Sequence, residues 1–175
     1  TRPVLSAVAF DPWQDRRTFY EYTSGDLIRI RDGLGNETDY SYNADGTLLS
    51  ITDARGKTTT FSYLDAYKNL TKITDADSNE TLMEYDQNGN VTQVTDANLK
   101  ETVMTYDGKN RLLTVTDHLN NVTTTDYDGN GNVLSITDAK NRQTLFTYNS
   151  LNQLISVENE LGHTIGIAYD DNGRV

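Results

Sequence analysis

The stretch Thr95-Asp96-Ala97-Asn98-Leu99-Lys100-Glu101-Thr102-Val103-Met104-Thr105-Tyr106-Asp107 sets out a pattern that the chain repeats. Its first two residues return 21 residues later as Thr116-Asp117, and its last two return as Tyr127-Asp128. A third copy begins at Thr137-Asp138. A fixed period of roughly 20–50 residues is the sequence signature of a repeat architecture, in which each unit packs on its neighbours. The stretch therefore predicts an array.

Two series of anchor residues extend this register along the chain. Tyrosines recur 20 to 22 residues apart, and an aspartate precedes most of them by ten residues. One residue is missing near Ser24-Gly25 and one is added in Asp65-Ala66-Tyr67-Lys68-Asn69, both in expected turns, which tolerate such changes. The predicted structural anchors are Tyr22, Tyr42, Tyr63, Tyr85, Tyr106, Tyr127, Tyr148, Tyr169, Asp32, Asp53, Asp75, Asp96, Asp117 and Asp138, with Asn159 continuing the second series.

Each repeat is predicted to contain two short strands and two turns. Thr102, Met104 and Tyr106 share one face under the period-two alternation of a half-buried strand. Gly or Asn recurs at the turn positions, where hairpins require residues that adopt positive φ at low cost, although Ser78 and Leu99 break this preference. The fold class is therefore predicted to be all-β: a repetitive antiparallel β-ribbon of about eight ~21-residue repeats, forming a curved, solenoid-like sheet.

The second strand of each repeat leaves one question open. Aliphatic residues lie six and nine positions after the anchor tyrosine, as Leu112 and Val115 do after Tyr106. A separation of three residues places these side chains on opposite faces of a regular strand. Either a β-bulge restores them to one face, or both faces of the sheet are partly covered.

The whole chain is interpreted as a single array, residues 1–175. Residues 1–19 are a degenerate first repeat, 20–169 are regular repeats, and 170–175 are a truncated repeat. In the first of these, residues 4–10 are expected to form a strand and 11–14 a turn. Because the sequence stops inside a repeat, we expect it to be a segment of a longer protein.

Composition excludes several classes of partner. The net charge is −11, so nucleic acid and anionic membranes are not expected partners, since phosphate binding depends on Lys and Arg. No apolar run approaches the roughly 18 residues that a spanning helix needs, so membrane insertion is not expected. The chain has no cysteine, which removes disulfides, thiolate metal sites and cysteine nucleophiles.

No catalytic, cofactor-binding or metal-binding residue is predicted. The acidic run that starts at Asp75 has Glu80 where an EF-hand loop needs glycine, and it lacks the bidentate glutamate. Asp and Asn side chains that cap their own turn backbones explain the pattern without a metal. His118 and His163 occupy turn positions without a recurring partner. The protein is therefore expected not to be an enzyme.

Two segments carry a family resemblance: Tyr85-Asp86-Gln87-Asn88-Gly89-Asn90-Val91-Thr92-Gln93-Val94-Thr95-Asp96 and Tyr127-Asp128-Gly129-Asn130-Gly131-Asn132-Val133-Leu134-Ser135-Ile136-Thr137-Asp138. They resemble the YD repeat of Rhs proteins, of the shell components of bacterial toxin complexes and of animal teneurins. The resemblance covers nearly all of residues 4–175, although Tyr42-Asn43 and Tyr148-Asn149 lack the aspartate. It implies a β-ribbon that winds into a hollow shell, in a bacterial protein that is secreted or on the cell surface.

The resemblance implies a structural function. The predicted role is that of a wall segment whose partners are the remainder of its parent chain and an enclosed C-terminal toxin domain. The alternative is an extracellular carbohydrate-binding or cell-adhesion module with glycans as ligands. Trp13 and Tyr67 lie outside the tyrosine series and are the tentative ligand contacts. Unpaired edge strands also predict self-association of the isolated segment.

Overall fold

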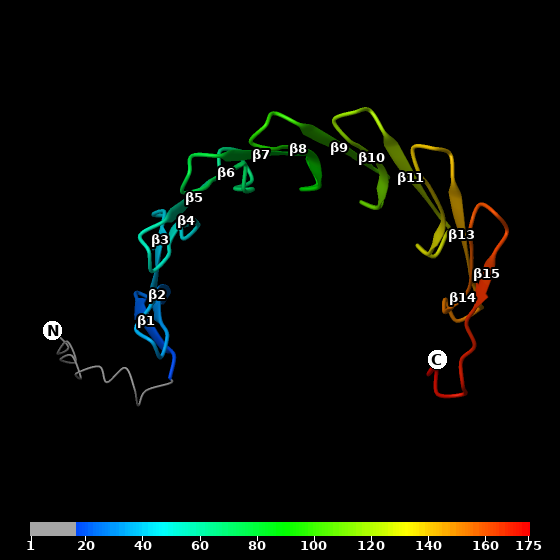
Figure 1. The fold of residues 1–175 in the computed structure, drawn as a ribbon, viewed down its shortest axis with the longest axis horizontal. Helices are drawn as coiled ribbons and strands as arrows, with labels where there is room; N and C mark the ends of the chain where they lie inside the picture. Colours follow the sequence, from blue (N-terminus) through cyan, green and yellow to red (C-terminus); the bar gives the residue numbers. More distant parts are fainter. Residues whose placement is uncertain (1–16) are drawn as a thin grey trace. The chain divides into compact units, whose positions relative to one another are not determined.

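The computed structural model describes residues 17–175, which form fifteen β-strands and no helix (Figure 1). The predicted all-β class is thereby confirmed. The strand expected at 4–10, the turn expected at 11–14 and the tentative ligand contact Trp13 lie outside the described residues. No helix within residues 17–175 is long and apolar enough to cross a membrane.

The chain divides into two compact units, one ending at Leu82 and the other beginning at Met83. The first contains β1 (Phe19–Thr23), β2 (Asp26–Arg31), β3 (Glu37–Tyr42), β4 (Leu48–Thr52), β5 (Thr58–Ser62) and β6 (Lys72–Thr74), and β7 (Glu80–Tyr85) spans the division. The second contains β8 (Val91–Thr95), β9 (Glu101–Tyr106), β10 (Leu112–Thr116), β11 (Val122–Tyr127), β12 (Val133–Thr137), β13 (Gln143–Tyr148), β14 (Leu154–Glu158) and β15 (Thr164–Gly166).

Within each unit, every strand pairs antiparallel with the next strand in the chain, so sheet order follows chain order. This arrangement results from the repeat itself, because each strand is followed by a turn too short for any other connection. The antiparallel strand–turn–strand repeat predicted from the sequence is confirmed.

A β-bulge settles the question left open for the second strand. Tyr106 pairs with Leu112 and Met104 pairs with Val115, and the register shifts between Leu112 and Thr114. The extra residue returns both aliphatic side chains to the face of the tyrosine. Equivalent register shifts occur next to Tyr42, Tyr127 and Tyr148. We call this side of the sheet the tyrosine face.

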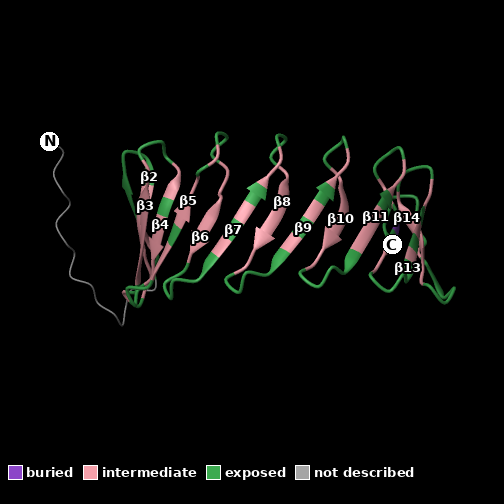
Figure 2. Cartoon of the chain, turned by 90° about the horizontal axis from the view of Figure 1, so that it is seen from above, coloured by how far each residue is buried: buried purple, intermediate pink, exposed green. Residues whose placement is uncertain are grey.

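The sheet is one layer thick. None of the hydrophobic side chains within residues 17–175 is fully buried, and the one buried polar residue is Ser135. Strand residues are mostly half-buried and turn residues are mostly exposed (Figure 2). The partial burial comes from side chains of neighbouring strands, as expected for repeats that pack on each other side by side.

One irregular spacing is accommodated in a turn and the other next to a turn. Ser24 and Gly25 both have positive φ, 54° and 100°, and form a two-residue hairpin turn between β1 and β2. The turn from Asp65 to Asn69 keeps the ordinary five-residue length, because Lys68 adopts φ 60° and Asn69 bonds Asp65 as in other turns. The added residue is therefore Leu64, which is exposed just before that turn, and the prediction that it lies within residues 65–69 is wrong.

Candidate functional site

The repeated turn is the most regular feature of the molecule, and Asp107 illustrates it. One carboxylate oxygen of Asp107 accepts backbone N–H groups of Lys109 (2.8 Å) and Arg111 (3.0 Å), and the other accepts Nε of Arg111 (2.7 Å). The N–H of Asn110 donates to the carbonyl of Asp107 at 3.0 Å, and Asn110 has φ 61°. The first residue thus caps the turn, and the fourth takes the left-handed conformation.

The turns fall into two sets at opposite ends of the strands. In both sets the backbone N–H of the fourth turn residue donates to the carbonyl of the first turn residue, and the fourth residue has positive φ. The turns that follow the anchor tyrosines, which we call tyrosine-side turns, begin at Asn43, Asp65, Asp86, Asp107, Asp128, Asn149 and Asp170. The turns that begin at the second anchor series, which we call aspartate-side turns, begin at Asp32, Asp53, Asp75, Asp96, Asp117, Asp138 and Asn159.

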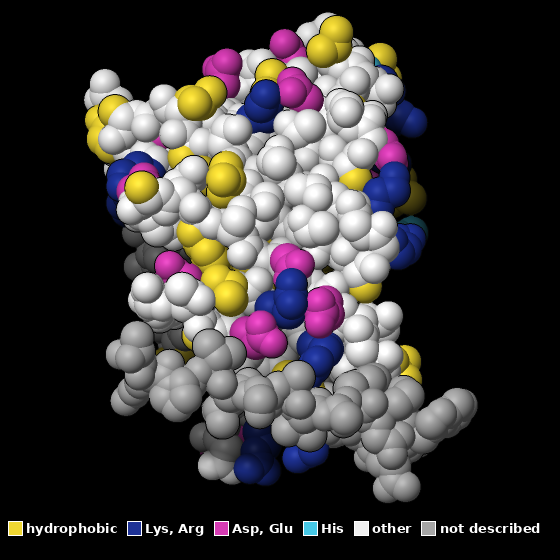
Figure 3. Space-filling model, turned by 90° about the vertical axis from the view of Figure 1, so that its left-hand side faces the viewer, with side chains coloured by type: hydrophobic (Ala, Val, Ile, Leu, Met, Phe, Trp, Pro, Cys, Tyr) yellow, Lys and Arg dark blue, Asp and Glu magenta, His cyan; other side chains and the backbone are white. Residues whose placement is uncertain are grey.

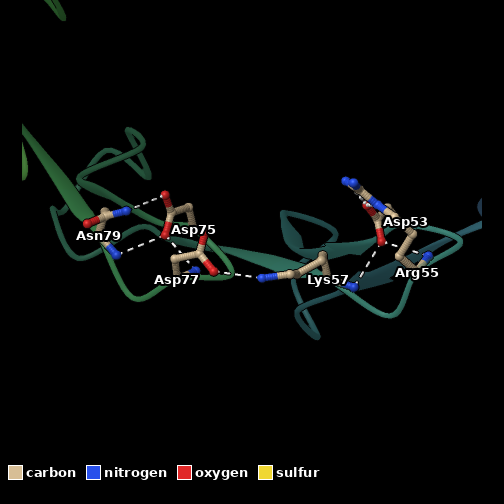
Figure 4. A network of polar contacts seen from close by, with 6 residues as sticks. All are labelled: Asp53, Arg55, Lys57, Asp75, Asp77 and Asn79. Atoms are coloured by element: carbon tan, nitrogen blue, oxygen red, sulfur yellow. Dashed lines mark hydrogen bonds and ion pairs between the residues drawn. The ribbon is translucent and has the colours of Figure 1, made fainter.

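Two neighbouring aspartate-side turns of the first unit show how the carboxylates are used (Figure 4). Asp75 accepts the backbone N–H groups of Asp77 (2.8 Å) and Asn79 (2.9 Å) through one oxygen and the Asn79 amide through the other. An ion pair of 2.6 Å joins Lys57, from the turn that begins at Asp53, to Asp77. Both groups of this pair are exposed, so it contributes little stability.

Hydrogen bonding lowers the pKa of all six anchor aspartates. The largest cause at each is a hydrogen bond from the fifth residue of its own turn, which favours the charged carboxylate. The side chain of Arg142 lowers the pKa of Asp138 to about 2, and the backbone N–H and guanidinium of Arg111 lower the pKa of Asp107 to about 2. These carboxylates therefore remain ionised at neutral pH while bonded to their own turns.

The carboxylates do not converge on a metal-binding geometry. No group of three or more His, Cys, Asp or Glu side chains within residues 17–175 is placed to hold a metal ion. His118 and His163 are exposed in separate aspartate-side turns, and the backbone N–H of His163 donates to Asn159. The structure therefore does not bring the two histidines of the chain together.

The anchor tyrosines connect neighbouring repeats. The hydroxyl of Tyr106 donates to the carbonyl of Val91 at 2.8 Å, and that of Tyr127 donates to Leu112 at 2.9 Å. The same contact, always to the residue 15 positions earlier, joins Tyr42 to Leu27 and Tyr169 to Leu154. These tyrosine rings are half-buried, whereas Tyr22 is 62% exposed. That the whole series acts as structural anchors stays a prediction.

Charged side chains pair on the surface of the sheet. Arg29 contacts Asp39 and Glu37, and acidic and basic side chains lie next to each other on the face drawn in Figure 3. The bond with Asp39 raises the pKa of Arg29 above its usual value. In the second unit the guanidinium of Arg111 lies 4.5 Å from the ring centre of Tyr127, within cation–π range.

The tentative ligand contact that the structure describes is Tyr67. Its ring is 68% exposed in the turn from Asp65 to Asn69. Exposure makes this side chain available to a ligand but does not identify one, so its role stays a prediction.

Open recesses lie between neighbouring aspartate-side turns in both units. One, of about 360 Å³, lies between the turns that begin at Asp32 and Asp53. Another, of about 290 Å³, lies between the turns that begin at Asp117 and Asp138. Both are lined mainly by turn residues and strand threonines. A third recess, of about 400 Å³, lies between the turns that begin at Asp53 and Asp75, which the ion pair of Lys57 and Asp77 joins.

Asparagines at the fifth turn position are functional residues that the sequence did not lead us to predict. Asn36, Asn79, Asn90, Asn121 and Asn132 each donate their side-chain amide to the capping aspartate of their turn. Their recurrence four residues after an aspartate is visible in the sequence and is the signal that identifies them.

Comparison with protein families gives five matches to the RHS Repeat family, over residues 20–58, 42–80, 65–101, 106–143 and 127–164. The matched segments overlap and together include most of the chain. A comparison with curated proteins gave no match.

Solved structures share the fold. The chain is similar to TcdB2-TccC3-Cdc42, with 24% identity over 70% of this chain and a TM-score of 0.61. It is also similar to TcdB2-TccC3, with 19% identity over 83% of this chain and a TM-score of 0.66. The Photorhabdus luminescens Tc holotoxin pore matches over 90% of this chain, with 16% identity and a TM-score of 0.60. This chain covers 7%, 9% and 12% of those three chains, respectively.

Proposed function

This chain belongs to the RHS repeat family, and we propose that it is a non-catalytic wall segment of a larger YD-repeat shell that encloses or displays a C-terminal toxin domain. Its partners are then the remainder of its own parent chain and the enclosed effector. The parent protein is secreted by, or carried on the surface of, a bacterium.

The single-layer sheet is the observation that carries this proposal. No hydrophobic side chain within residues 17–175 is fully buried, so the segment builds no interior of its own. A one-layer sheet made of one repeated hairpin extends by adding hairpins and has a space on each side, as a wall requires. The likeness in fold to small parts of much longer toxin-complex chains supports the same function.

The carbohydrate-binding alternative has no observation in its favour beyond the exposure of Tyr67, so it stays a prediction. The proposed wall function needs no catalytic group. It instead requires that the sheet be continuous enough to exclude a protease, and this requirement makes the proposal testable.

The test uses the parent protein that carries this array. Thr114 pairs with strands on both sides, so Thr114→Pro removes a ladder hydrogen bond in the middle of the sheet and should open the wall. Ala97→Pro is the matched control, because Ala97 is the second residue of a turn, where proline is well tolerated. The C-terminal domain should resist added protease in the parent and in Ala97→Pro, and be degraded in Thr114→Pro. Equal degradation in all three proteins contradicts enclosure.

A further inference from the structure

The second unit contains a set of side-chain hydrogen bonds that join one turn to the next. The amide of Asn90, the fifth residue of its tyrosine-side turn, donates in two directions. One bond goes to the capping residue Asp86 at 2.8 Å, and the other crosses to Oδ1 of Asn110 in the next tyrosine-side turn at 2.9 Å. Asn110 is the left-handed fourth residue of that turn, with φ 61°.

The same arrangement recurs two repeats later. Asn132 donates to its own capping residue Asp128 at 2.8 Å and to Oδ1 of Asn152 in the next turn at 2.9 Å. Asn130 adds a second bond to the same Asn152 oxygen at 3.1 Å. Asn152 is again a left-handed fourth residue, with φ 59°.

The junction between these two is also bonded, through different residues. A guanidinium nitrogen of Arg111 donates to the carbonyl of Asp128 at 3.0 Å, and the amino group of Lys109 donates to the carbonyl of Gly129 at 3.3 Å. In the turn that begins at Asp128 the fourth residue is Gly131, which has no side chain to accept a hydrogen bond. Arg111 of the preceding turn therefore bonds to the backbone instead. Three successive junctions on the tyrosine side are thus bonded.

The aspartate side provides a comparison within the same unit. Asn121 is a fifth residue that bonds its capping Asp117 at 2.9 Å, and Asn141 is the left-handed fourth residue of the next turn. These are the same two residue types that bond across the tyrosine side, but here both line the recess of about 290 Å³ and do not meet. Within residues 83–175, no hydrogen bond or ion pair joins one aspartate-side turn to the next.

We propose that Asn110 and Asn152 are coupling residues, which hold neighbouring repeats together at the tyrosine-side edge of the second unit. Glycine adopts positive φ at lower cost than asparagine, but it supplies no acceptor for the amide of the preceding turn. Repeats of this unit then separate first at the aspartate-side edge, where the turns are not joined. This inference does not depend on the proposed wall function.

The test compares four asparagine-to-glycine substitutions in the 175-residue chain, read by amide hydrogen exchange. Asn110→Gly and Asn152→Gly remove the cross-turn acceptor, whereas Asn120→Gly and Asn141→Gly make the same change on the other edge. All four positions have φ between 59° and 62°, so any effect of glycine itself is common to them.

Removing one hydrogen bond should speed exchange in the two turns that meet at the junction by about five-fold. The effect should be larger for Asn152→Gly, which loses two bonds, and absent across the junctions next to Asn120 and Asn141. Asn152→Asp keeps an acceptor oxygen and tolerates positive φ, so it should retain most of the protection. Equal acceleration at both edges, or none at Asn110 and Asn152, overturns the proposal.

Discussion

Replacing Tyr106 with phenylalanine removes one oxygen atom from a contact that joins two repeats. The hydroxyl lies 2.8 Å from the carbonyl of Val91, on the neighbouring strand. The ring lies on the tyrosine face beside Leu112, and phenylalanine keeps that ring. A net hydrogen bond of this kind contributes about 1 kcal/mol to the free energy of unfolding. We therefore expect Tyr106→Phe to lower that free energy by about 1 kcal/mol.

Tyr106→Ala removes the ring as well. Full burial of a tyrosine takes roughly 150–250 Å² out of water, so a half-buried ring accounts for roughly 100 Å². At ~25 cal/mol per Å² this area contributes about 2.5 kcal/mol, and with the hydrogen bond the expected loss of unfolding free energy is about 3.5 kcal/mol. No cavity term is added, because a side chain that is not fully buried leaves space that solvent can enter.

The assay is urea unfolding of the 175-residue chain, in which a shift of the midpoint at constant slope reports stability. Tyr20 supplies the control, because its side chain is 56% exposed and so buries less area than that of Tyr106, and Tyr20→Ala should shift the midpoint less than Tyr106→Ala does. The reasoning is refuted if Tyr106→Phe leaves the midpoint unchanged and Tyr106→Ala costs no more than Tyr20→Ala.

Three further predictions concern the turns and use the same urea assay. Leu99 has φ 59° and is 82% exposed, so Leu99→Gly should raise stability by up to about 1 kcal/mol, whereas Leu119→Gly, without positive φ to relieve, should not. Gly89 has φ 84°, so Gly89→Ala should lower the free energy of unfolding by about 1 kcal/mol. Gly129 has no positive φ and no atom within 4 Å of an added Cβ, so Gly129→Ala should be neutral or stabilising. The pKa of Asp107, about 2, lies below the value of about 3.9 in the unfolded chain. The stability that its ionised carboxylate contributes is therefore complete above about pH 3.9 and is lost as the pH falls towards 2. Asp107→Asn should flatten the pH dependence in that window; an unchanged acid slope would contradict the assignment.

Local rules were sufficient to predict the strands, the antiparallel pairing and the positions of the turns. Alternating side chains and short turns act over a few residues, so one sequence reveals them. The positive φ of Ser78 and Leu99 also follows from the repeat, although neither residue favours it, because hairpin geometry outweighs the local preference. The face of Val115 was not predictable, since it depends on a bulge.

Contacts between repeats were beyond the sequence argument. Each tyrosine hydroxyl bonds the carbonyl of the residue 15 positions earlier, on the neighbouring strand. The spacing of the tyrosines in the sequence does not predict which carbonyl the hydroxyl reaches. The cross-turn bonds of Asn110 and Asn152 depend on how closely two turns approach. Asn121 and Asn141 have the same residue types in the same order and do not bond, so the asparagine pattern alone does not show which edge is bonded.

The balance of polar and apolar contacts explains why such a segment suits a wall. Each turn satisfies its own backbone N–H groups through its capping residue, so a hairpin needs no neighbour for that purpose. Its apolar side chains do need neighbours, because the tyrosine face is half-buried by adjacent strands alone. Stability should therefore rise with the number of repeats, as in other linear arrays, while the face itself remains available to whatever lies beside it. Loss of a tyrosine then weakens the junction between two repeats, and loss of a capping aspartate weakens one turn.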